Sequence, residues 1–559
     1  MDRFYSADAD PEDTEEIVES SCAEGMLHGR VLVFDTTLRD GEQAAGSRLD
    51  PSEKLRIATQ LAKLGVDAIE AGFPASSPKE FESVRLLSQR LVGPVVCALS
   101  RAIPGDIQIC GQALQNAEHP RIHTGLGVSD IHIQGKFRDP RYGRDLTEKR
   151  ETVLRMALES VRLAKSLVDD VEFYAEDTFR ADPGYLAQVI GTVINAGATI
   201  INIPDTTGYA QPGQISGLIK NLMKHVPELS GVVLSVHCHN DLGLAVANTL
   251  TGLRAGARQA ECTILGIGER AGNASLEEVV MAVKTRKDYY GLETVVNTQE
   301  IYRTCQMVAR AFGFQVPRNK AIVGLNAFAH SAGIHVDGFL KDRKTYEIIK
   351  PQDVGVPGSR IVLTARSGRH AVRHRLEQLG YVLSSDQVDT IYARFLEVAD
   401  RVRQVSDQAL LSLLNGQAQA RHTIQLQELS FWGATNRTAH ARARITIGGR
   451  TVEAEGVGDG PVDASYAAMA QATKMQVDLE DFSLVTTGKG SEAIGEATVR
   501  ISRHGTTTAT GRGASTDIVQ ASALAYLDAL NEMMQAEHND DRAARQKPSN
   551  ADPPRLGGG

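Results

Sequence analysis

Two polar segments that lie far apart in the chain carry residue types that bind metals and move protons. They are DTTLRDGEQ at 35–43 and HCHND at 237–241, and each closely follows a short apolar run typical of a β-strand. His237 and His239 are two positions apart, so both imidazoles point to the same face of a strand. Together with the carboxylate of Asp40, they form a candidate site for one divalent metal ion.

The donor types favour an open, catalytic metal site. One carboxylate, two imidazoles and the amide oxygen of Asn273 leave coordination positions free for water and a substrate. Such a site suits Mn, Mg or Zn acting as a Lewis acid on a carbonyl group. Arg39, beside Asp40, would add a donor for a carboxylate or a growing alkoxide. The set therefore predicts chemistry on a 2-oxo acid, whose ketone and carboxylate can chelate the metal.

A regular alternation of apolar runs and amphipathic segments positions these residues. The apolar runs lie at 31–35, 67–72, 95–99, 121–126, 170–174, 198–203, 231–237 and 259–264. The segments between them have helical spacing, as at 51–65 and 278–287. Eight such units predict an α/β fold, a (β/α)8 TIM barrel. A doubly wound sheet is the alternative, but no Gly-x-Gly-x-x-Gly follows the first run.

The polar candidates fall at the strand ends where a barrel of this kind builds its active site. The candidates after or near the end of a predicted strand are Arg39, Asp40, His123, Glu176, Thr206, His237, His239 and Asn273. Each has an ordinary alternative: Glu176 with Asp177 could cap the next helix, and Arg39 could pair with Asp35. A single histidine in a strand is more often a hydrogen-bonded core residue. The inference rests on the convergence of the set.

Composition sets the broad class of protein. The chain has 559 residues, so two or three domains are expected, and its apolar content of 42% is that of a globular protein. The net charge of −9 argues against a nucleic-acid partner, and no apolar run is long enough to span a membrane. Six cysteines scattered without a framework spacing predict reduced thiols. The acidic start resembles no secretory signal, so we expect a cytoplasmic protein.

The sequence divides into five predicted regions. They are a disordered acidic start at 1–29, the catalytic barrel at 30–295, helical linker subdomains at 296–418, an α+β regulatory domain at 419–536 and a disordered tail at 537–559. A polar loop at 326–338 interrupts the linker. The α+β region has two similar halves, each with alternating strands, a Gly-x-Gly loop and an apolar helix. Such a repeat is typical of a regulatory or dimerisation domain.

Long motifs in this chain closely resemble the acetyl-CoA-condensing, metal-dependent TIM-barrel family of 2-isopropylmalate, homocitrate and citramalate synthases. The motifs are DTTLRDGEQ, VEFYAEDTFR, NIPDTTGY, HCHNDLGLAVANTL, GIGERAGNASLEEV, NKAIVG and FAHSAGIHVDG. The resemblance runs from about residue 30 to 535. It implies a Claisen-type condensation of acetyl-CoA with 3-methyl-2-oxobutanoate, which gives 2-isopropylmalate and CoA and commits carbon to leucine.

The resemblance also implies roles for individual residues. The metal positions are Asp40, His237, His239 and Asn273. Arg39 would polarise the ketone, and His123 and Thr206 would hold the 2-oxo acid. Glu176 would serve acid/base chemistry near the acetyl methyl group. His335 and Tyr346, from the linker, would reach a barrel mouth and assist proton transfer.

For the C-terminal region, the resemblance implies a homodimer or homotetramer that binds leucine as a feedback inhibitor. The predicted sensing residues are Gly458, Gly460, Asp463, Ala464, Gly490 and Ala493. Gly-x-Gly loops let a ligand approach backbone amides closely. The alternative is that these loops are only tight turns of a dimerisation domain.

Other functions on the same barrel stay open at this level. A citramalate synthase would use pyruvate, a homocitrate synthase would use 2-oxoglutarate, and a lyase or aldolase would cleave an acyl-CoA. The homocitrate alternative is weaker, because the matching enzymes usually lack this C-terminal domain. The citramalate synthase is the closer rival, because pocket size around Cys97, Leu99 and His123 would decide between pyruvate and 3-methyl-2-oxobutanoate. One methyl group changes such selectivity by only about 1–3 kcal/mol.

Overall fold

The computed structural model describes residues 29–545, with gaps at 357, 382, 401, 403, 415–423, 435–436, 488–493 and 504–506. The predicted disordered start therefore lies almost wholly outside the described residues. The chain divides into two compact units between Ser406 and Asp407, and each is described by itself. Among the described residues, no helix has the length and apolar character needed to cross a lipid bilayer.

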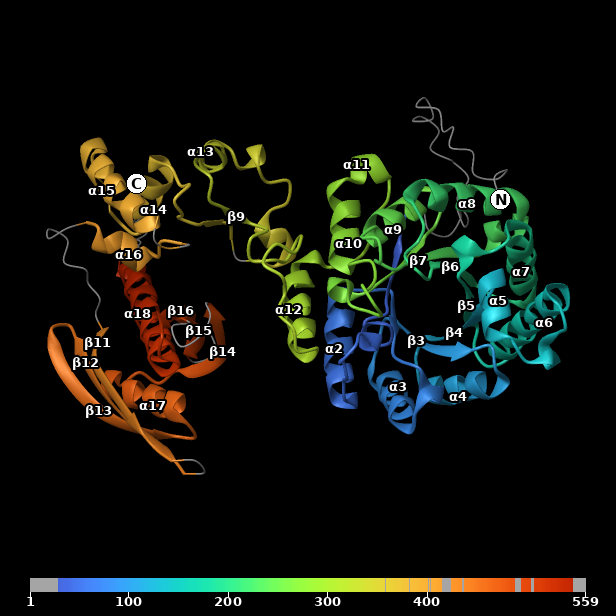
Figure 1. The fold of residues 1–559 in the computed structure, drawn as a ribbon, viewed down its shortest axis with the longest axis horizontal. Coiled ribbons are helices and arrows are strands. Elements are labelled where there is room, and N and C mark those ends of the chain that lie inside the picture. The colour runs from blue at the N-terminus through green and yellow to red at the C-terminus, as the bar shows by residue number, and fades with distance from the viewer. Residues whose placement is uncertain are drawn as a thin grey trace, which may run out of the picture. The chain divides into compact units, whose positions relative to one another are not determined.

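The first unit contains a closed barrel of eight parallel strands (Figure 1). The strands are β1 (Leu32–Asp35), β2 (Ala68–Glu70), β3 (Val95–Arg101), β4 (Pro120–Gly127), β5 (Asp170–Glu176), β6 (Ile200–Asp205), β7 (Val233–Cys238) and β8 (Gln259–Cys262). They pair in chain order, and β8 returns to β1 with Leu32 opposite Gln259. The predicted (β/α)8 barrel is confirmed and the doubly wound sheet is excluded, because every barrel strand pairs on both sides whereas an open sheet has two edge strands.

Helices follow the strands and cover the barrel wall. They are α2 (Pro51–Leu64), α3 (Pro78–Arg90), α4 (Pro104–Leu114), α5 (Asp130–Lys136), α6 (Leu146–Lys165), α7 (Pro183–Ala196), α8 (Pro212–His225), α9 (Ala245–Arg254) and α10 (Leu276–Thr285). Local sequence sets their ends. Asp50 caps α2 in a capping box with Glu53, and Gly65 ends this helix in the left-handed conformation at φ 82°.

Side chains along each strand alternate between the helix layer and the barrel interior. In β4, Ile122 joins the apolar core beneath the helices, whereas Arg121 and His123 point inward among polar groups. At the barrel floor, Arg121 donates to Asp170 at 2.8 Å and to Glu172 at 3.1 Å. A buried arginine needs such partners, because an unpaired charge in the interior is strongly destabilising.

After the barrel, the first unit continues with α11 (Lys287–Tyr290) and α12 (Ile301–Ala311) and then a smaller subdomain. This subdomain contains β9 (Ala329–His330), α13 (Gly333–Lys341), β10 (Arg360–Ile361), α14 (Arg369–Gln378) and α15 (Ser385–Ala399). The prediction of a loop over 326–338 was wrong. The backbone of β9 pairs with β10, and α13 starts at Gly333, so His335 lies on a helix.

The second unit consists of α16 and two copies of a three-stranded antiparallel sheet followed by a helix (Figure 1). Its elements are α16 (Asp407–Ser412), β11 (Ile424–Trp432), β12 (Ala439–Ile447), β13 (Arg450–Gly458), α17 (Pro461–Thr473), β14 (Asp478–Thr487), β15 (Ile494–Arg503), β16 (Thr507–Ser515) and α18 (Ile518–Arg545). Apolar residues of both copies share one core. The predicted internal repeat is confirmed, although α18 extends to Arg545, past the point where a disordered tail was expected.

Two Gly-x-Gly pairs of this unit, Gly456 with Gly458 and Gly511 with Gly513, lie in strands β13 and β16, not in loops as predicted. The pair at 488–490 lies outside the described residues. A Cβ on Gly458 would come within 2.5 Å of the Ala464 backbone nitrogen, and one on Gly513 within 2.2 Å of the Ala521 carbonyl oxygen. Real Cβ atoms do not approach other atoms so closely, so these positions accept only glycine. The close partner at both positions is the backbone of the following helix. Gly-x-Gly therefore lets α17 and α18 pack directly on β13 and β16.

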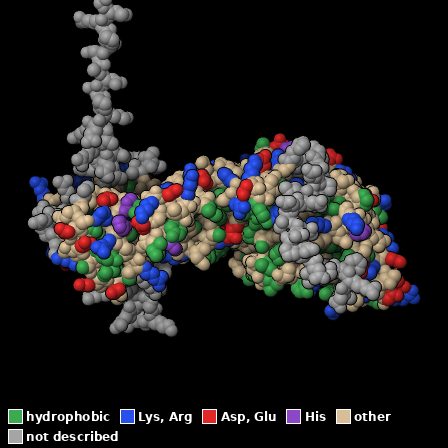
Figure 2. Space-filling model, turned by 90° about the horizontal axis from the view of Figure 1, so that it is seen from above, with side chains coloured by type: hydrophobic (Ala, Val, Ile, Leu, Met, Phe, Trp, Pro, Cys, Tyr) green, Lys and Arg blue, Asp and Glu red, His purple; other side chains and the backbone are tan. Residues whose placement is uncertain are grey.

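Surface charge is mixed. On the face presented in Figure 2, lysine and arginine side chains are interspersed with aspartate and glutamate, and apolar side chains lie between them. The grey atoms belong to residues that are not described. Where its surface is visible, this face has no continuous basic stripe of the kind that binds a nucleic-acid backbone.

Candidate functional site

Three of the predicted metal donors converge at the carboxyl ends of β1 and β7. The Nε2 atoms of His237 and His239 lie 3.2 Å apart, and Asp40 Oδ2 is 3.3 Å from the first and 3.8 Å from the second. All three residues are buried. The ligand atoms lie within 4.8 Å of one another, which is close enough to share one ion. Side chains two positions apart on a strand share a face, which explains why His237 and His239 lie together.

Asn273 comes from the loop after β8 and lies beside His239, with which its backbone forms an antiparallel bridge. Its Nδ2 donates to the Ile267 carbonyl at 3.2 Å, which fixes the orientation of the amide. Its Oδ1 is buried and has no hydrogen-bond donor, and the same is true of Asp40 Oδ1. Buried oxygens without a donor are uncommon and need an explanation such as an ion.

The donor set fits a divalent metal. It offers carboxylate and amide oxygens with two imidazoles, and Asp40 Oδ1 and Asn273 Oδ1 lack other partners. Burial and the neighbouring His237 lower the pKa of His239 to about 4, which keeps that ring neutral as a metal ligand must be. Burial alone would lower the pKa of His237, but Asp40 and Glu261 raise it to about 9. A bound cation would compete with that proton.

Arg39 and His123 both contact Glu70, which the sequence patterns did not single out. Glu70 ends β2 and is fully buried. Its Oε2 accepts from Arg39 Nε at 2.6 Å, and its Oε1 lies 2.9 Å from His123 Nδ1. The alternative pairing of Arg39 with Asp35 is wrong. The sequence AIEAG has an acidic residue at the end of an apolar strand, and this pattern could have identified Glu70.

A second missed carboxylate lies behind the histidines. Glu261 on β8 is fully buried, and its Oε2 is 3.1 Å from Nδ1 of His237. Histidines that bind metals commonly have a carboxylate at the second ring nitrogen, which orients the ring. In QAEC at 259–262, Glu261 and Gln259 are two apart and share the interior face, and this spacing could have identified both.

Glu176 ends β5 and is paired with cations. Lys136 Nζ lies within 2.6 Å of its carboxylate, and His132 Nδ1 lies 3.6 Å away. Burial alone would raise the pKa of Glu176, but hydrogen bonds from His132 and Lys136 lower it to about 2. The group is thus ionised at neutral pH. The helix-cap alternative is wrong, because Asp182 accepts from the Tyr185 backbone and caps α7.

Thr206 lies next to this region, just after β6. Its Oγ1 accepts from the backbone N–H of Asp177 at 2.9 Å, and its carbonyl oxygen accepts from Arg270 at 2.8 Å. Asp177 has a left-handed backbone with φ 66°. These contacts tie the loops after β5, β6 and β8 together at the barrel rim.

His335 and Tyr346 contact each other. Their ring centroids lie 4.5 Å apart, with one ring on α13 and the other directly after the turn at Arg343–Thr345. Tyr346 is 43% exposed. Among the described residues, no hydrogen bond or ion pair joins either ring to Asp40 or Glu176. The structure therefore does not bring these two predicted residues to the metal donors of the same chain.

The predicted effector residues lie at the junction of β13 and α17. Gly458 ends the strand, Gly460 precedes the helix, and Asp463 Oδ2 accepts from the Asp459 backbone at 3.0 Å. Ala464 is buried against the strand. Gly490 and Ala493 lie outside the described residues.

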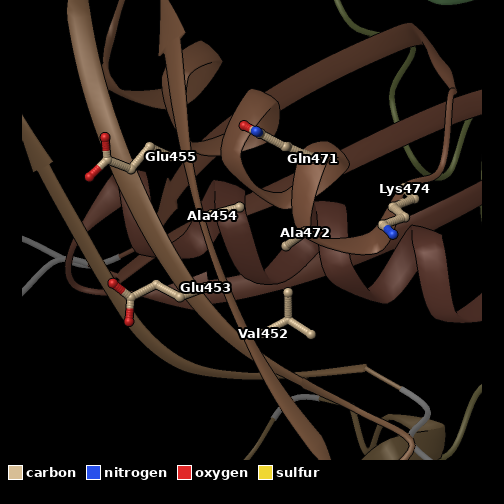
Figure 3. A pocket seen from close by; sticks show the side chains of 7 residues that line it. All are labelled: Val452, Glu453, Ala454, Glu455, Gln471, Ala472 and Lys474. Carbon is tan, nitrogen blue, oxygen red and sulfur yellow. The ribbon is translucent and has the colours of Figure 1, made fainter.

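A hollow in this unit occupies the other end of the same strand and helix (Figure 3). It is lined by Val452, Glu453, Ala454, Glu455, Gln471, Ala472 and Lys474. In Figure 3 the carboxylates of Glu453 and Glu455 point away from the helix residues. Both carboxylates are engaged by arginines of β12, so the hollow offers no free acidic group to a ligand amine.

Comparison with known proteins agrees with this architecture. Residues 30–308 match the HMGL-like family, residues 322–403 match the homocitrate synthase post-HMGL domain-like family, and residues 404–534 match the LeuA allosteric (dimerisation) domain. Fold and site together define the class. The first unit carries an HMGL-like (β/α)8 barrel with donors for a divalent metal on its carboxyl rim.

Relatives along nearly the whole chain narrow the class further. The 2-isopropylmalate synthase of Heliobacterium modesticaldum is 48% identical, over 90% of this chain and 97% of that protein. Those of Dictyoglomus turgidum and Pyrococcus furiosus are 45% and 46% identical, over 92% and 90% of this chain and 100% and 99% of theirs. The chain belongs to the 2-isopropylmalate synthase family, a family of condensing enzymes.

Proposed function

We propose that the protein condenses acetyl-CoA with 3-methyl-2-oxobutanoate and water to give 2-isopropylmalate and CoA, the committed step of leucine biosynthesis. The observation that carries the proposal is the convergence of Asp40, His237 and His239 beside Arg39. Asn273, whose buried oxygen has no donor, bridges to His239 through its backbone. This is the arrangement expected for a site that binds a 2-oxo acid through its ketone and carboxylate. Near-complete alignment with named synthases supports the choice of reaction.

The metal site would use Asp40, His237, His239 and Asn273 as ligands. When bound, a Mn, Mg or Zn ion would supply Lewis-acid polarisation of the ketone. Arg39 would donate to the ketone oxygen, where negative charge develops in the transition state. Glu70 holds the guanidinium in place from one side, so the donor is already oriented before the reaction.

Residues around this donor set would hold the 2-oxo acid. His123 has a buried Nε2 without a hydrogen-bond partner, while Glu70 engages its other nitrogen. That free nitrogen can contact the acid or the product hydroxyl. Thr206 would contribute through the same rim loops. Both assignments follow the family resemblance.

Proton removal from the acetyl methyl group needs a positioned base, because a thioester methyl is a very weak acid. Glu176 is ionised by its contacts with Lys136 and His132, so it would act as a base and not as an acid. His335 and Tyr346 would assist proton transfer once this pair of rings reaches a barrel mouth. Hydrolysis of the resulting thioester then releases CoA.

The second unit would bind leucine and lower activity, in a homodimer or homotetramer located in the cytoplasm. The match to the LeuA allosteric (dimerisation) domain supports both roles. Within the described part of the chain, Gly460 and Asp463 lie at the surface of the β13–α17 junction and are open to a ligand. Gly458 and Ala464 are occupied by helix packing, so they would shape the site without contacting leucine.

A CoA-release assay with one acid at a time tests the reaction. We expect 3-methyl-2-oxobutanoate to give the highest kcat/KM, above pyruvate and 2-oxoglutarate, in the presence of acetyl-CoA and Mn²⁺. Preference for pyruvate would reassign the protein as a citramalate synthase. No CoA release with any acid, together with cleavage of an acyl-CoA, would identify a lyase.

A leucine titration of the same assay tests the effector role. We expect inhibition by leucine in the full chain and weaker inhibition in Asp463→Asn. Valine, at the same concentrations, is the matched control for nonspecific effects. If leucine does not change the rate of CoA release, the effector role is rejected. Dimerisation is then the remaining proposed role of the second unit.

A further inference from the structure

The turn after α12 presents a lysine to the barrel. This turn spans residues 317–324 and contains the NKAIVG motif. Backbone hydrogen bonds close it, from Lys320 N to the Pro317 oxygen at 2.9 Å and from Gly324 N to the Lys320 oxygen at 2.9 Å. Val323 anchors it in the apolar core of the first unit. The turn is therefore a fixed element between the barrel and the linker subdomain.

The backbone of this turn is strained. Ile322 has a φ of 69°, a conformation that a β-branched residue rarely adopts. At Gly324, a Cβ would come within 2.6 Å of both the Arg318 and Lys320 carbonyl oxygens. Such conformations persist only where surrounding contacts determine them, and they cluster at functional positions. The strain indicates that the direction of Lys320 is specified by the fold.

Lys320 reaches three partners at the start of α10. Its Nζ lies 2.6 Å from Ser275 Oγ, 2.5 Å from Glu278 Oε1 and 3.2 Å from Glu277 Oε1. The lysine is largely buried and Glu277 is fully buried. A buried carboxylate of this kind depends on a nearby cation, because removing one partner leaves an uncompensated charge.

Two routes lead from these partners to Asn273. Ser275 is two residues further along the same loop. Glu277 uses its other oxygen to accept from the Leu265 backbone at 3.0 Å, in a turn where Leu265 has a φ of 60°. Gly266, the next residue of that turn, accepts from the Asn273 backbone at 2.9 Å. Lys320 thus fixes both sides of the loop that carries Asn273, whose backbone bridges to His239 and whose side-chain oxygen is buried without a donor.

We infer that Lys320 is a positioning residue for the metal site, through which the linker sets the placement of Asn273. The inference rests on the proposed function, in which Asn273 is a ligand. Lys320 itself touches neither metal nor substrate. Because it belongs to the turn at 317–324, a shift of this turn would be transmitted to the Asn273 loop through the contacts of Lys320 with Ser275 and Glu277.

The test is Mn²⁺ binding to the full-length protein, measured by titration calorimetry without substrate. Groups that contact a metal ligand change affinity by about 10–100-fold when removed. Because Lys320 acts on Asn273 through its neighbours, we expect Lys320→Met to weaken Mn²⁺ binding by about 10-fold, the lower end of that range. Lys320→Arg keeps the charge and should recover most of the affinity. A steady-state comparison should show a higher Mn²⁺ requirement in Lys320→Met and a smaller change in KM for acetyl-CoA.

Two controls separate positioning from general loss of stability. Lys287→Met removes an exposed lysine paired with Glu293 and should leave Mn²⁺ affinity unchanged. Leu114→Ala opens a cavity at the end of α4 and should lower the unfolding midpoint without weakening Mn²⁺ binding. If Lys320→Met does not fold, the double variant Lys320→Met with Glu277→Gln replaces it, because it removes one positive and one negative charge together. This double variant should bind Mn²⁺ about 10-fold more weakly than the wild type.

The outcomes are distinct. Wild-type Mn²⁺ affinity in folded Lys320→Met, or in the charge-balanced double variant, overturns the inference. Failure of the wild-type protein to bind Mn²⁺ rejects the metal site and the inference with it. If Mn²⁺ binds but no CoA is released, the proposed reaction fails, while weaker binding by Lys320→Met still supports the positioning role.

Discussion

Arg39 donates from Nε to Glu70 Oε2 at 2.6 Å, across the ends of the neighbouring strands β1 and β2. The same carboxylate faces His123 Nδ1 at 2.9 Å. One fully buried glutamate therefore orients both a guanidinium and an imidazole toward the rim of the barrel. Arg39 also lies 3.6 Å from Asp40, so this pair connects the predicted oxyanion donor directly to the predicted metal site.

Replacing this carboxylate should impair catalysis more than folding. In Glu70→Gln the side chain keeps its size but loses the charge that holds Arg39. Loss of one preorganised donor typically costs about 10²–10³ in rate, and we expect kcat/KM to fall by roughly that factor. Steady-state CoA release measures it. The control Glu159→Gln changes an exposed glutamate on α6 and should leave kcat/KM unchanged; an equal loss there would contradict the assignment.

Removing the metal should abolish activity and lower stability. We expect dialysis against a chelator to stop CoA release and Mn²⁺ to restore it. A ligand present at a hundredfold excess over its Kd stabilises the folded state by about 2.7 kcal/mol. Thermal unfolding with and without Mn²⁺ measures this effect. Asp40→Asn should lose most of the Mn²⁺-dependent shift, whereas a full shift in that variant would exclude Asp40 as a ligand.

Gly458 and Gly460, which are two positions apart, should respond very differently to replacement by alanine. Gly458→Ala places a Cβ within 2.5 Å of the Ala464 backbone nitrogen, so it should destabilise the second unit. Overpacking of this kind costs about 1–3 kcal/mol. Gly460→Ala meets no atom within 4 Å and has an extended backbone, so it should be tolerated. Denaturant unfolding followed by the fluorescence of Trp432, on β11 of this unit, compares the two.

The ion pair of Glu176 should give a defined pH dependence of stability. Its pKa is lowered from 4.5 to about 2, so the folded state binds this proton less readily than the unfolded state. The group therefore stabilises the fold above about pH 4.5, and this contribution is lost as pH falls toward about 2.

Lys136→Met should remove part of that contribution, by about 1 kcal/mol for a partly exposed pair. The difference in unfolding free energy from the wild type should be constant above pH 5 and shrink as pH falls through the window. Urea unfolding at a series of pH values measures it. The exposed Lys63→Met is the control, and a difference that grows on acidification would contradict the ion pair.

Much of the barrel could be predicted from sequence because its signal is local. Each strand of a parallel barrel is buried on both faces, so it appears as an apolar run, and the polar residues that follow it mark the rim. Asp40, His237 and His239 were placed together by this logic, and the structure brings them within 4.8 Å. The closure of β8 onto β1 also fits the predicted strand order.

Glu70 and Glu261 escaped prediction for a physical reason. Each is a single acidic residue in a short strand. The partner of Glu70 is Arg39 and that of Glu261 is His237, and each partner follows or belongs to a different strand of the barrel. A one-dimensional pattern does not say which inward-facing side chains meet across the barrel. The Gly-x-Gly pairs show the same limit in the second unit. The sequence predicted loops at these pairs, yet Gly458 and Gly513 lie in strands, where the backbone of the following helix approaches them.

The sequence by itself determined the eight strand–helix units, the residue types at the rim and the internal repeat, because hydrophobic period and turn chemistry act over neighbouring residues. Only the tertiary structure decided which carboxylate holds which cation and that Lys320 reaches the Asn273 loop. It also decided that His335 lies on a helix and that its ring contacts the ring of Tyr346 at a tilted angle. These contacts join residues distant in the chain, and their geometry exists only once the barrel has closed.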